Sequence, residues 1–183
     1  KQTKLLHKAL ASIAMAQCYD LILMAEAVLS DQSPVQAKRF ATLTKTLISA
    51  DKSFTLFEWA IYRLAVSPFG TQPKGKRSLS DTKDALNQLF FYLASLSATE
   101  HRQALLLGAQ QALGFTLAKP AKISLKQLDN AVETLATIKP LHKPQLLKAL
   151  MTAIYADGQV TDDEMTLVRT IALLIDCPIP PQR

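Results

Sequence analysis

Apolar residues recur every three or four positions along most of this chain, which is the period of an α-helix that buries one face. The clearest stripes are Leu6/Leu10/Ile13, Phe40/Leu43/Leu47, Leu86/Leu89/Phe90/Leu93/Leu96, Leu105/Leu106/Ala109/Leu113, Leu128/Val132/Leu135 and Leu167/Ile171/Leu174. No segment alternates convincingly between apolar and polar residues, as a half-buried strand would. The pattern therefore predicts an all-α protein with about seven or eight helices of ordinary length.

Short polar signals predict where several of these helices begin and end. Three segments place Ser three residues before Gln or Glu, which is the spacing of a capping box: Ser33-Pro34-Val35-Gln36, Ser97-Ala98-Thr99-Glu100 and Ser124-Leu125-Lys126-Gln127. Gly114 follows an apolar stripe and is a plausible helix stop, because glycine adopts the left-handed conformation that ends many helices.

Two segments of the chain repeat the same pattern. Ala50-Asp51-Lys52-Ser53-Phe54-Thr55-Leu56-Phe57-Glu58 and Ala156-Asp157-Gly158-Gln159-Val160-Thr161-Asp162-Asp163-Glu164 both read Ala-Asp, two variable residues, an apolar residue, Thr, two more residues and Glu. Arg63 and Arg169 follow each Glu at the same distance. We interpret this as an internal repeat of a helix, a short turn and a second helix, with both copies packed into one body.

The repeat suggests a division of the chain into four parts. Residues 1–66 form the first repeat, 67–78 an exposed linker loop, 79–118 a middle pair of helices and 119–183 the second repeat. The linker prediction rests on residues 67–77, which contain two Pro, two Gly and three basic residues.

The second copy partly matches the calcium-binding loop of an EF-hand. That loop needs oxygen ligands at its first, third and fifth positions, Gly at the sixth and Glu at the twelfth. With Gly158 at the sixth position, Asp157 and Glu164 fall on the fifth and twelfth, but Ala153 and Tyr155 occupy the first and third. A hard cation with so few anionic ligands would bind weakly.

Helix capping explains most of the same motif without a metal. Thr161 and Glu164 have the spacing of a capping box, as do Thr55 and Glu58, and Gly158 suits a left-handed residue after the preceding helix. The two aspartates of the repeat are the residues that capping explains least. The candidate metal ligands are therefore Asp51, Glu58, Asp157 and Glu164, with structural capping as the competing interpretation.

Local sequence motifs for catalysis are absent. His7, His101 and His142 are scattered, and the chain contains no H-E-x-x-H, G-x-S-x-G, P-loop or G-x-G-x-x-G motif. The sequence therefore predicts that this chain is not an enzyme by itself and has no cofactor of its own. Spacing along the sequence does not report three-dimensional proximity, so it does not test a site assembled from residues distant in sequence.

The formal net charge is +6, and basic residues gather in one part of the chain. These are Lys119, Lys122, Lys126, Lys139, Lys143 and Lys148. A basic surface can bind anionic lipid or nucleic acid, although solvated helix faces are the simpler interpretation. Cys18 and Cys177 show no CxxC or zinc-finger spacing, and their disulfide state is left open.

No stretch of about 20 mainly apolar residues, the length needed to cross a bilayer, is visible. The chain begins with Lys1 rather than Met. We therefore expect a processed product or an excised part of a longer protein.

The two repeated segments resemble known helical domains. Tyr155-Ala156-Asp157-Gly158-Gln159-Val160-Thr161-Asp162-Asp163-Glu164 resembles the turn of TerB-like (tellurite-resistance-like) domains. Ala50-Asp51-Lys52-Ser53-Phe54-Thr55-Leu56-Phe57-Glu58-Trp59 and the ending Asp176-Cys177-Pro178-Ile179-Pro180-Pro181 are similar to the C-terminal region of bacterial membrane zinc metallopeptidases of the HtpX and CAAX-prenyl-protease type. The likeness covers both ends of the chain well and the middle weakly.

The resemblance implies a regulatory or interaction domain on the cytoplasmic face, tethered to the inner membrane through a parent peptidase that carries the zinc. The expected partner is the parent's own N-terminal peptidase domain or another protein, rather than nucleic acid. Suspected metal binding in TerB-like domains corresponds here to Asp51, Glu58, Asp157 and Glu164, although Lys52 replaces Gly in the first copy. The competing functions are a weak divalent-metal sensor that uses the acidic turns, and a module that binds an anionic membrane or nucleic-acid surface.

Overall fold

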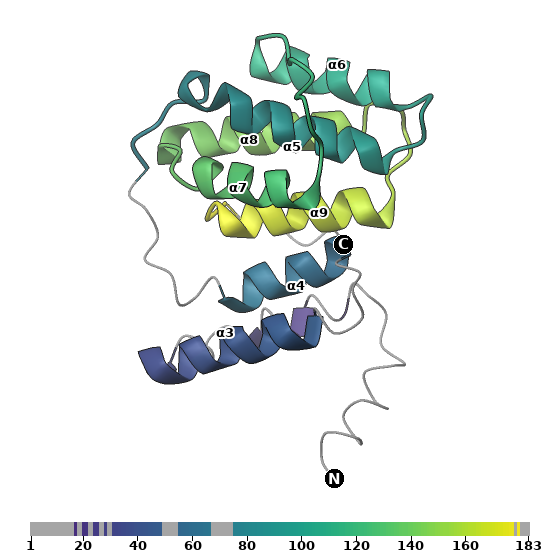
Figure 1. Ribbon diagram of the computed structural model, residues 1–183. Coiled ribbons are helices and arrows are strands. Elements are labelled where there is room, and N and C mark those ends of the chain that lie inside the picture. The colour runs from purple at the N-terminus through teal and green to yellow at the C-terminus, as the bar shows by residue number, and fades with distance from the viewer. Residues whose placement is uncertain are drawn as a thin grey trace. The chain divides into compact units, whose positions relative to one another are not determined.

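The computed structural model of the chain describes residues 31–48, 55–66, 75–177 and 179, together with positions 17, 20, 21, 24, 25 and 28. Within these residues the regular structure is helical, and the all-α prediction is confirmed (Figure 1). The nearest approach to a strand there is an isolated parallel bridge between Arg77 and Ile138.

The chain divides into two compact units, Lys1–Gly70 and Thr71–Arg183. The sequence predicts one body that contains both repeats, whereas each of these units contains one repeat. Helices α3 (Pro34–Ile48) and α4 (Leu56–Val66) belong to the first unit. The middle pair of helices shares the second unit with the second repeat.

Helix α3 begins with the predicted capping box. Ser33 Oγ donates to Gln36 Oε1 at 2.8 Å, and the Gln36 N–H donates to Ser33 Oγ at 3.4 Å. The prediction that Leu43 points inward is wrong, because its side chain is 54% exposed. Ala37 lies on the buried face of α3, and Val35 lies on its exposed face.

The described residues of the second unit form five helices. They are α5 (Lys83–Leu96), α6 (Arg102–Leu113), α7 (Leu125–Leu135), α8 (Lys143–Ile154) and α9 (Asp162–Leu174), with short 3-10 turns η2 (Ser80–Thr82) and η3 (Pro140–His142). Helix α6 packs mainly on α8, and α5 mainly on α7 (Figure 1). The α5–α6 connection and the α8–α9 turn therefore belong to the same packed group.

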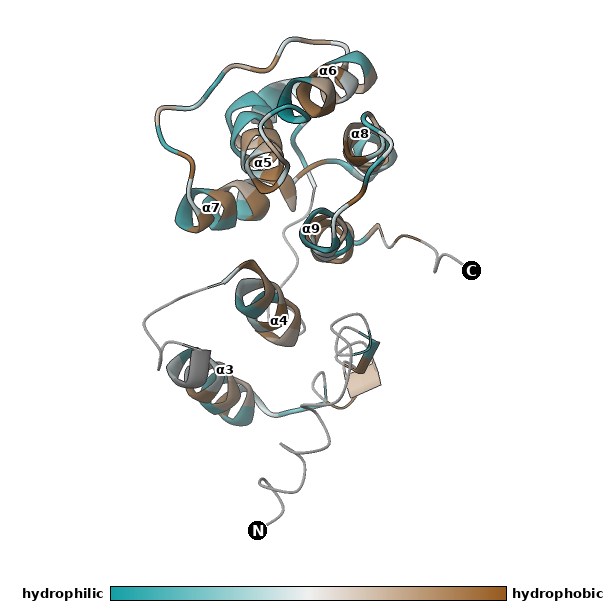
Figure 2. Ribbon diagram, turned by 90° about the vertical axis from the view of Figure 1, so that its right-hand side faces the viewer, coloured by the Kyte–Doolittle hydropathy of each residue, from teal (hydrophilic) through white to brown (hydrophobic). Residues whose placement is uncertain are grey.

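The predicted apolar stripes form the core of the second unit. Fully buried members include Leu86, Leu89, Phe90, Leu93, Leu128, Val132, Leu135, Leu167 and Ile171. The end-on view of Figure 2 shows the helices around this shared interior. Burial of one such side chain contributes about 1.5–3 kcal/mol, so these stripes hold the unit together.

The helix ends predicted at Ser124 and Gly114 are confirmed, and the one predicted at Ser97 is wrong. Ser124 Oγ accepts the Gln127 N–H at the start of α7, and Gly114 ends α6 with a φ of +79°. The capping box predicted at Ser97 is wrong, because α6 begins only at Arg102 and the Ser97 side chain is buried. Its hydroxyl has a different partner, described below.

The end of the predicted linker is paired with another segment of the second unit. The N–H groups of Lys76 and Arg77 donate to the Thr137 carbonyl at 2.9 and 3.2 Å, and the Lys139 N–H donates to the Arg77 carbonyl at 2.9 Å. A Cβ at Gly75 would overlap the backbone of Ile138, so the close approach of these segments requires glycine. Residues 67–74 of the predicted linker lie outside the described part of the chain.

The helix boundaries follow the sequence repeat. Ile48 ends α3 and Ile154 ends α8, while Leu56 begins α4 and Asp162 begins α9. Each pair is separated by the same number of residues as the two repeated segments. None of the helices in the described part of the chain combines the length and apolar character needed to cross a membrane.

Candidate functional site

The turn between α8 and α9 is built by its own local sequence. Gly158 has a φ of +78°, and its N–H donates to the Tyr155 carbonyl at 3.2 Å. Thr161 Oγ1 then accepts the Glu164 N–H at 3.2 Å, while Glu164 Oε2 accepts the Thr161 N–H at 2.8 Å. This reciprocal pair is the predicted capping box, and it starts α9.

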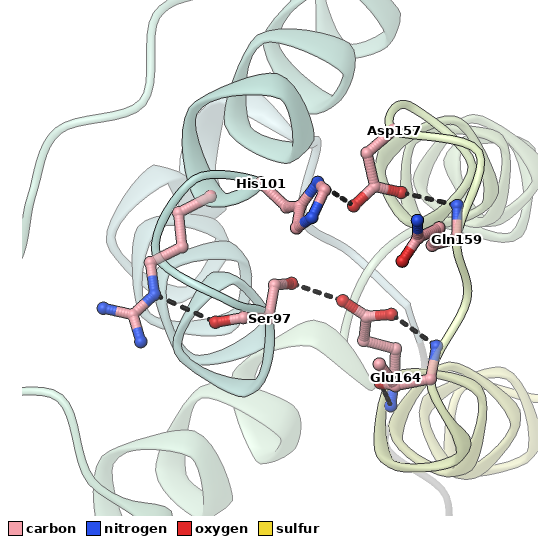
Figure 3. Close-up of polar contacts among 7 residues, drawn as sticks. Ser97, His101, Asp157, Gln159 and Glu164 are labelled. Atoms are coloured by element: carbon pink, nitrogen blue, oxygen red, sulfur yellow. Dashed lines mark hydrogen bonds and ion pairs between the residues drawn. The ribbon is translucent and has the colours of Figure 1, made fainter.

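Glu164 also connects this turn to the α5–α6 connection. Its second oxygen, Oε1, accepts a hydrogen bond from the Ser97 hydroxyl (Figure 3). Glu164 is 1% exposed and Ser97 is 4% exposed, while the Ser97 carbonyl accepts the Arg102 Nε–H at 3.1 Å. A hydrogen bond to a charged group contributes about 1.5–3 kcal/mol, so this buried contact is the strong link between the two segments.

Asp157 makes a second contact between the same segments. Its Oδ1 accepts the Gln159 N–H at 2.9 Å, which stabilises the turn. Its Oδ2 lies 3.1 Å from His101 Nδ1 in the α5–α6 connection (Figure 3). Because the His101 side chain is 31% exposed, solvent weakens this contact, and a pair of this kind is worth about 0–1 kcal/mol.

The charge at the start of α9 acts on a neighbouring phenol. Tyr92 lies on α5, and its pKa is raised by burial and, to a smaller extent, by the negative charge of Asp163. Both effects favour the neutral phenol. Tyr92 therefore remains protonated at neutral pH and does not act as a base.

Ser97, His101 and Asp157 are the residue types of a hydrolase triad, but their arrangement differs. A triad needs the nucleophile within hydrogen-bond reach of the histidine, and the histidine oriented by the acid. The contact between His101 and Asp157 meets the second condition. The Ser97 hydroxyl instead donates a hydrogen bond to Glu164, and the Ser97 side chain is buried. The geometry is that of a structural network.

Three of the four carboxylates predicted as metal ligands, those of Glu58, Asp157 and Glu164, make hydrogen bonds within the protein. In α4, Glu58 Oε2 accepts from the Thr55 N–H at 2.9 Å and from Thr55 Oγ1 at 2.8 Å, and the Glu58 N–H donates to Thr55 Oγ1 at 3.2 Å. Glu58 belongs to the first unit, Asp157 and Glu164 to the second, and Asp51 lies outside the described residues.

The structure brings Asp157 and Glu164 to one turn, where protein groups already use both carboxylates. Across the described residues, no three His, Cys, Asp or Glu side chains are grouped to hold a metal ion. A cation bound by Glu164 or Asp157 would compete with the Ser97 hydroxyl or the His101 imidazole for these oxygens.

Comparison with known proteins does not assign the chain to a family. No family model, curated protein or solved structure matches it.

Proposed function

We propose that this chain is a non-catalytic regulatory or interaction domain of a membrane-bound zinc metalloendopeptidase. The observation that supports this best is the shared local structure of the two segments that resemble the tails of such peptidases. Each places a reciprocal Thr–Glu capping box at the start of a helix, α4 in one case and α9 in the other. In this proposal, the zinc belongs to the peptidase domain of the parent, and the present domain lies on the cytoplasmic face of the inner membrane.

The use of the polar groups at the α8–α9 turn supports a binding role over a chemical one. Glu164 and Ser97 are buried and bonded to each other, and Asp157 is bonded to the turn and to His101. Such a network fixes the orientation of α9 relative to α5 and α6. A fixed helical surface is suited to recognition of the peptidase domain or of another protein.

Proteolysis assays test this proposal. We expect the purified chain to leave casein intact with or without a chelator, because the chemistry resides in the parent. In the parent, deletion of this domain should preserve zinc-dependent cleavage of a short peptide and alter cleavage of protein substrates. Robust chelator-sensitive cleavage by the chain alone would refute the proposal. A parent reading frame that encodes neither hydrophobic spans nor H-E-x-x-H would also refute it.

A divalent-metal sensor is the competing function, and one contact favours it. His101 Nδ1 in the α5–α6 connection and Asp157 Oδ2 in the α8–α9 turn place a nitrogen and an oxygen ligand 3.1 Å apart. Zinc accepts both ligand types. This function requires that metal binding breaks the present contact, so it predicts that Asp157→Asn abolishes any metal-dependent stabilisation.

A further inference from the structure

One edge of the second unit combines positive charge with an exposed leucine. We define the basic edge as Lys76, Arg77, Lys139, Leu141 and Lys143. Backbone hydrogen bonds bring its two segments together, because Lys76 and Arg77 both donate to Thr137, and Lys139 donates to Arg77. The side chains of Lys76, Arg77 and Lys139 are exposed, so their charges face solvent.

Leu141 is the most exposed large apolar side chain of the described residues, at 86%. It lies in η3, where the His142 N–H donates to the Lys139 carbonyl at 2.9 Å and the Lys143 N–H donates to the Pro140 carbonyl. Single exposed leucines are common. This one is presented by an ordered turn between Lys139 and Lys143, so its environment is positively charged.

The start of α8 adds to the positive character of the edge. Helix α8 has no side-chain cap and no acidic residue in its first turn, so no carboxylate of that turn offsets the positive end of its helix dipole. Asp81 and Asp84 line the same surface cavity as Arg77, and their carboxylates offset part of the positive charge of the edge. The Ser78 hydroxyl and N–H donate to Asp81 at 2.7 and 2.8 Å. Those hydrogen bonds, with smaller contributions from Lys139 and Arg77, lower the pKa of Asp81.

We propose that the basic edge docks on a bilayer surface that contains anionic phospholipid. Lys76, Arg77 and Lys139 would contact headgroup phosphates while Leu141 enters the apolar boundary below them, as in other peripheral membrane contacts. Nucleic acid fits the edge less well, since Leu141 offers neither a stacking ring nor a hydrogen bond to a base.

This inference rests on the proposed function only for the presence of a bilayer beside the domain. The basic edge is smaller than the basic region that the sequence predicts between Lys119 and Lys148. Only Lys139 and Lys143 of that run belong to the basic edge, and Lys119 and Lys122 lie in the α6–α7 connection instead.

Sedimentation with lipid vesicles tests the inference on the full chain. We expect binding to vesicles of phosphatidylcholine mixed with phosphatidylglycerol, and little binding to phosphatidylcholine alone. The triple variant Lys76→Gln/Arg77→Gln/Lys139→Gln should lower the partition coefficient about 100-fold, because each basic residue near an anionic surface contributes a factor of about five. Leu141→Ser should lower it about ten-fold.

Matched variants outside the basic edge serve as controls. Lys119→Gln/Lys122→Gln/Lys126→Gln removes the same charge, and Leu107→Ser changes a leucine that is 49% exposed on α6. Because all these side chains are exposed, helical circular dichroism should be unchanged in every variant.

Equal losses in the control and test variants would overturn the inference, because general charge would then explain binding. Unchanged vesicle binding by the triple variant would also overturn it, as would binding to duplex DNA in the absence of vesicle binding. The vesicle result is independent of the casein and parent-deletion assays, so the two proposals can fail separately.

Discussion

Glu164 shows how one buried carboxylate can serve two parts of a fold. One oxygen caps α9 through the Thr161 N–H, and the other accepts the Ser97 hydroxyl from the α5–α6 connection. Glu58 caps α4 by the same local rule, but it is only half-buried and its hydrogen bonds are solvent-exposed. A comparison of the two glutamates therefore separates the capping role, which both have, from the additional hydrogen bond of Glu164 with Ser97.

Replacement of Glu164 by Ala should destabilise the second unit by about 3 kcal/mol. The cap is worth about 1 kcal/mol, and the buried Ser97 hydroxyl left without its acceptor costs about 1–3 kcal/mol more. Glu58→Ala should cost the first unit about 1 kcal/mol. Urea unfolding measures both effects, because the single Trp, Trp59, reports the first unit by fluorescence and circular dichroism follows the helices of both. An equal cost for the two substitutions would contradict the second role of Glu164.

The sequence predicts the hydrogen bonds of this site that form within one helical turn, and it misses the hydrogen bond between residues far apart in the chain. The Thr161–Glu164 and Thr55–Glu58 boxes follow from a three-residue spacing, because both partners lie on one helical turn. Ser97 lies 67 positions from Glu164, and no local spacing rule relates them. Ser97 also has the sequence signal of an N-cap, which is why its hydroxyl is assigned to the wrong partner.

At the scale of the helices, the α5–α6 connection and the α8–α9 turn are connected twice, with unequal strength. The Ser97–Glu164 contact is buried, whereas the His101–Asp157 contact is partly exposed. Water competes for the second contact and not for the first. We therefore expect the Ser97–Glu164 hydrogen bond to stabilise the packing of the two segments more than the His101–Asp157 contact does.

Double-mutant cycles measure this difference. The pair Ser97→Ala and Glu164→Gln should show a coupling free energy of about 1–2 kcal/mol, because the two residues share a buried bond. The pair His101→Ala and Asp157→Asn should show about 0.5 kcal/mol or less. A larger coupling for the exposed pair would mean that the His101–Asp157 contact, and not the buried hydrogen bond, is the main link between the two segments.

Helix positions follow from the sequence better than helix faces do. Serine caps and glycine stops mark the start of α3 and α7 and the end of α6, because those signals act within one turn. The prediction that Leu43 is buried is wrong, because apolar spacing within a helix does not show which part of its face another element covers. Apolar periodicity predicts which residues share one face of a helix, but tertiary packing decides which of those residues are buried.

For the whole molecule, the internal repeat is the feature that sequence and structure share most closely. The ends of α3 and α8 and the starts of α4 and α9 keep one constant separation. The boundary between the two compact units, after Gly70, falls within the linker predicted at 67–78, but the sequence does not indicate which repeat the middle pair of helices joins. The middle pair packs with the second repeat through α5–α7 and α6–α8 contacts that lie far apart in the chain.

We propose that the acidic α8–α9 turn joins α9 to the α5–α6 connection and is not a cation site. Thermal unfolding of the full chain in millimolar calcium, magnesium or zinc, compared with a chelator, tests it most directly. A metal present at 100 times its Kd would stabilise the fold by about 2.7 kcal/mol, which is readily visible in the midpoint. We predict the same midpoint with each metal and with the chelator. An increase that Asp157→Asn or Glu164→Gln abolishes would contradict the claim and establish the turn as a metal site.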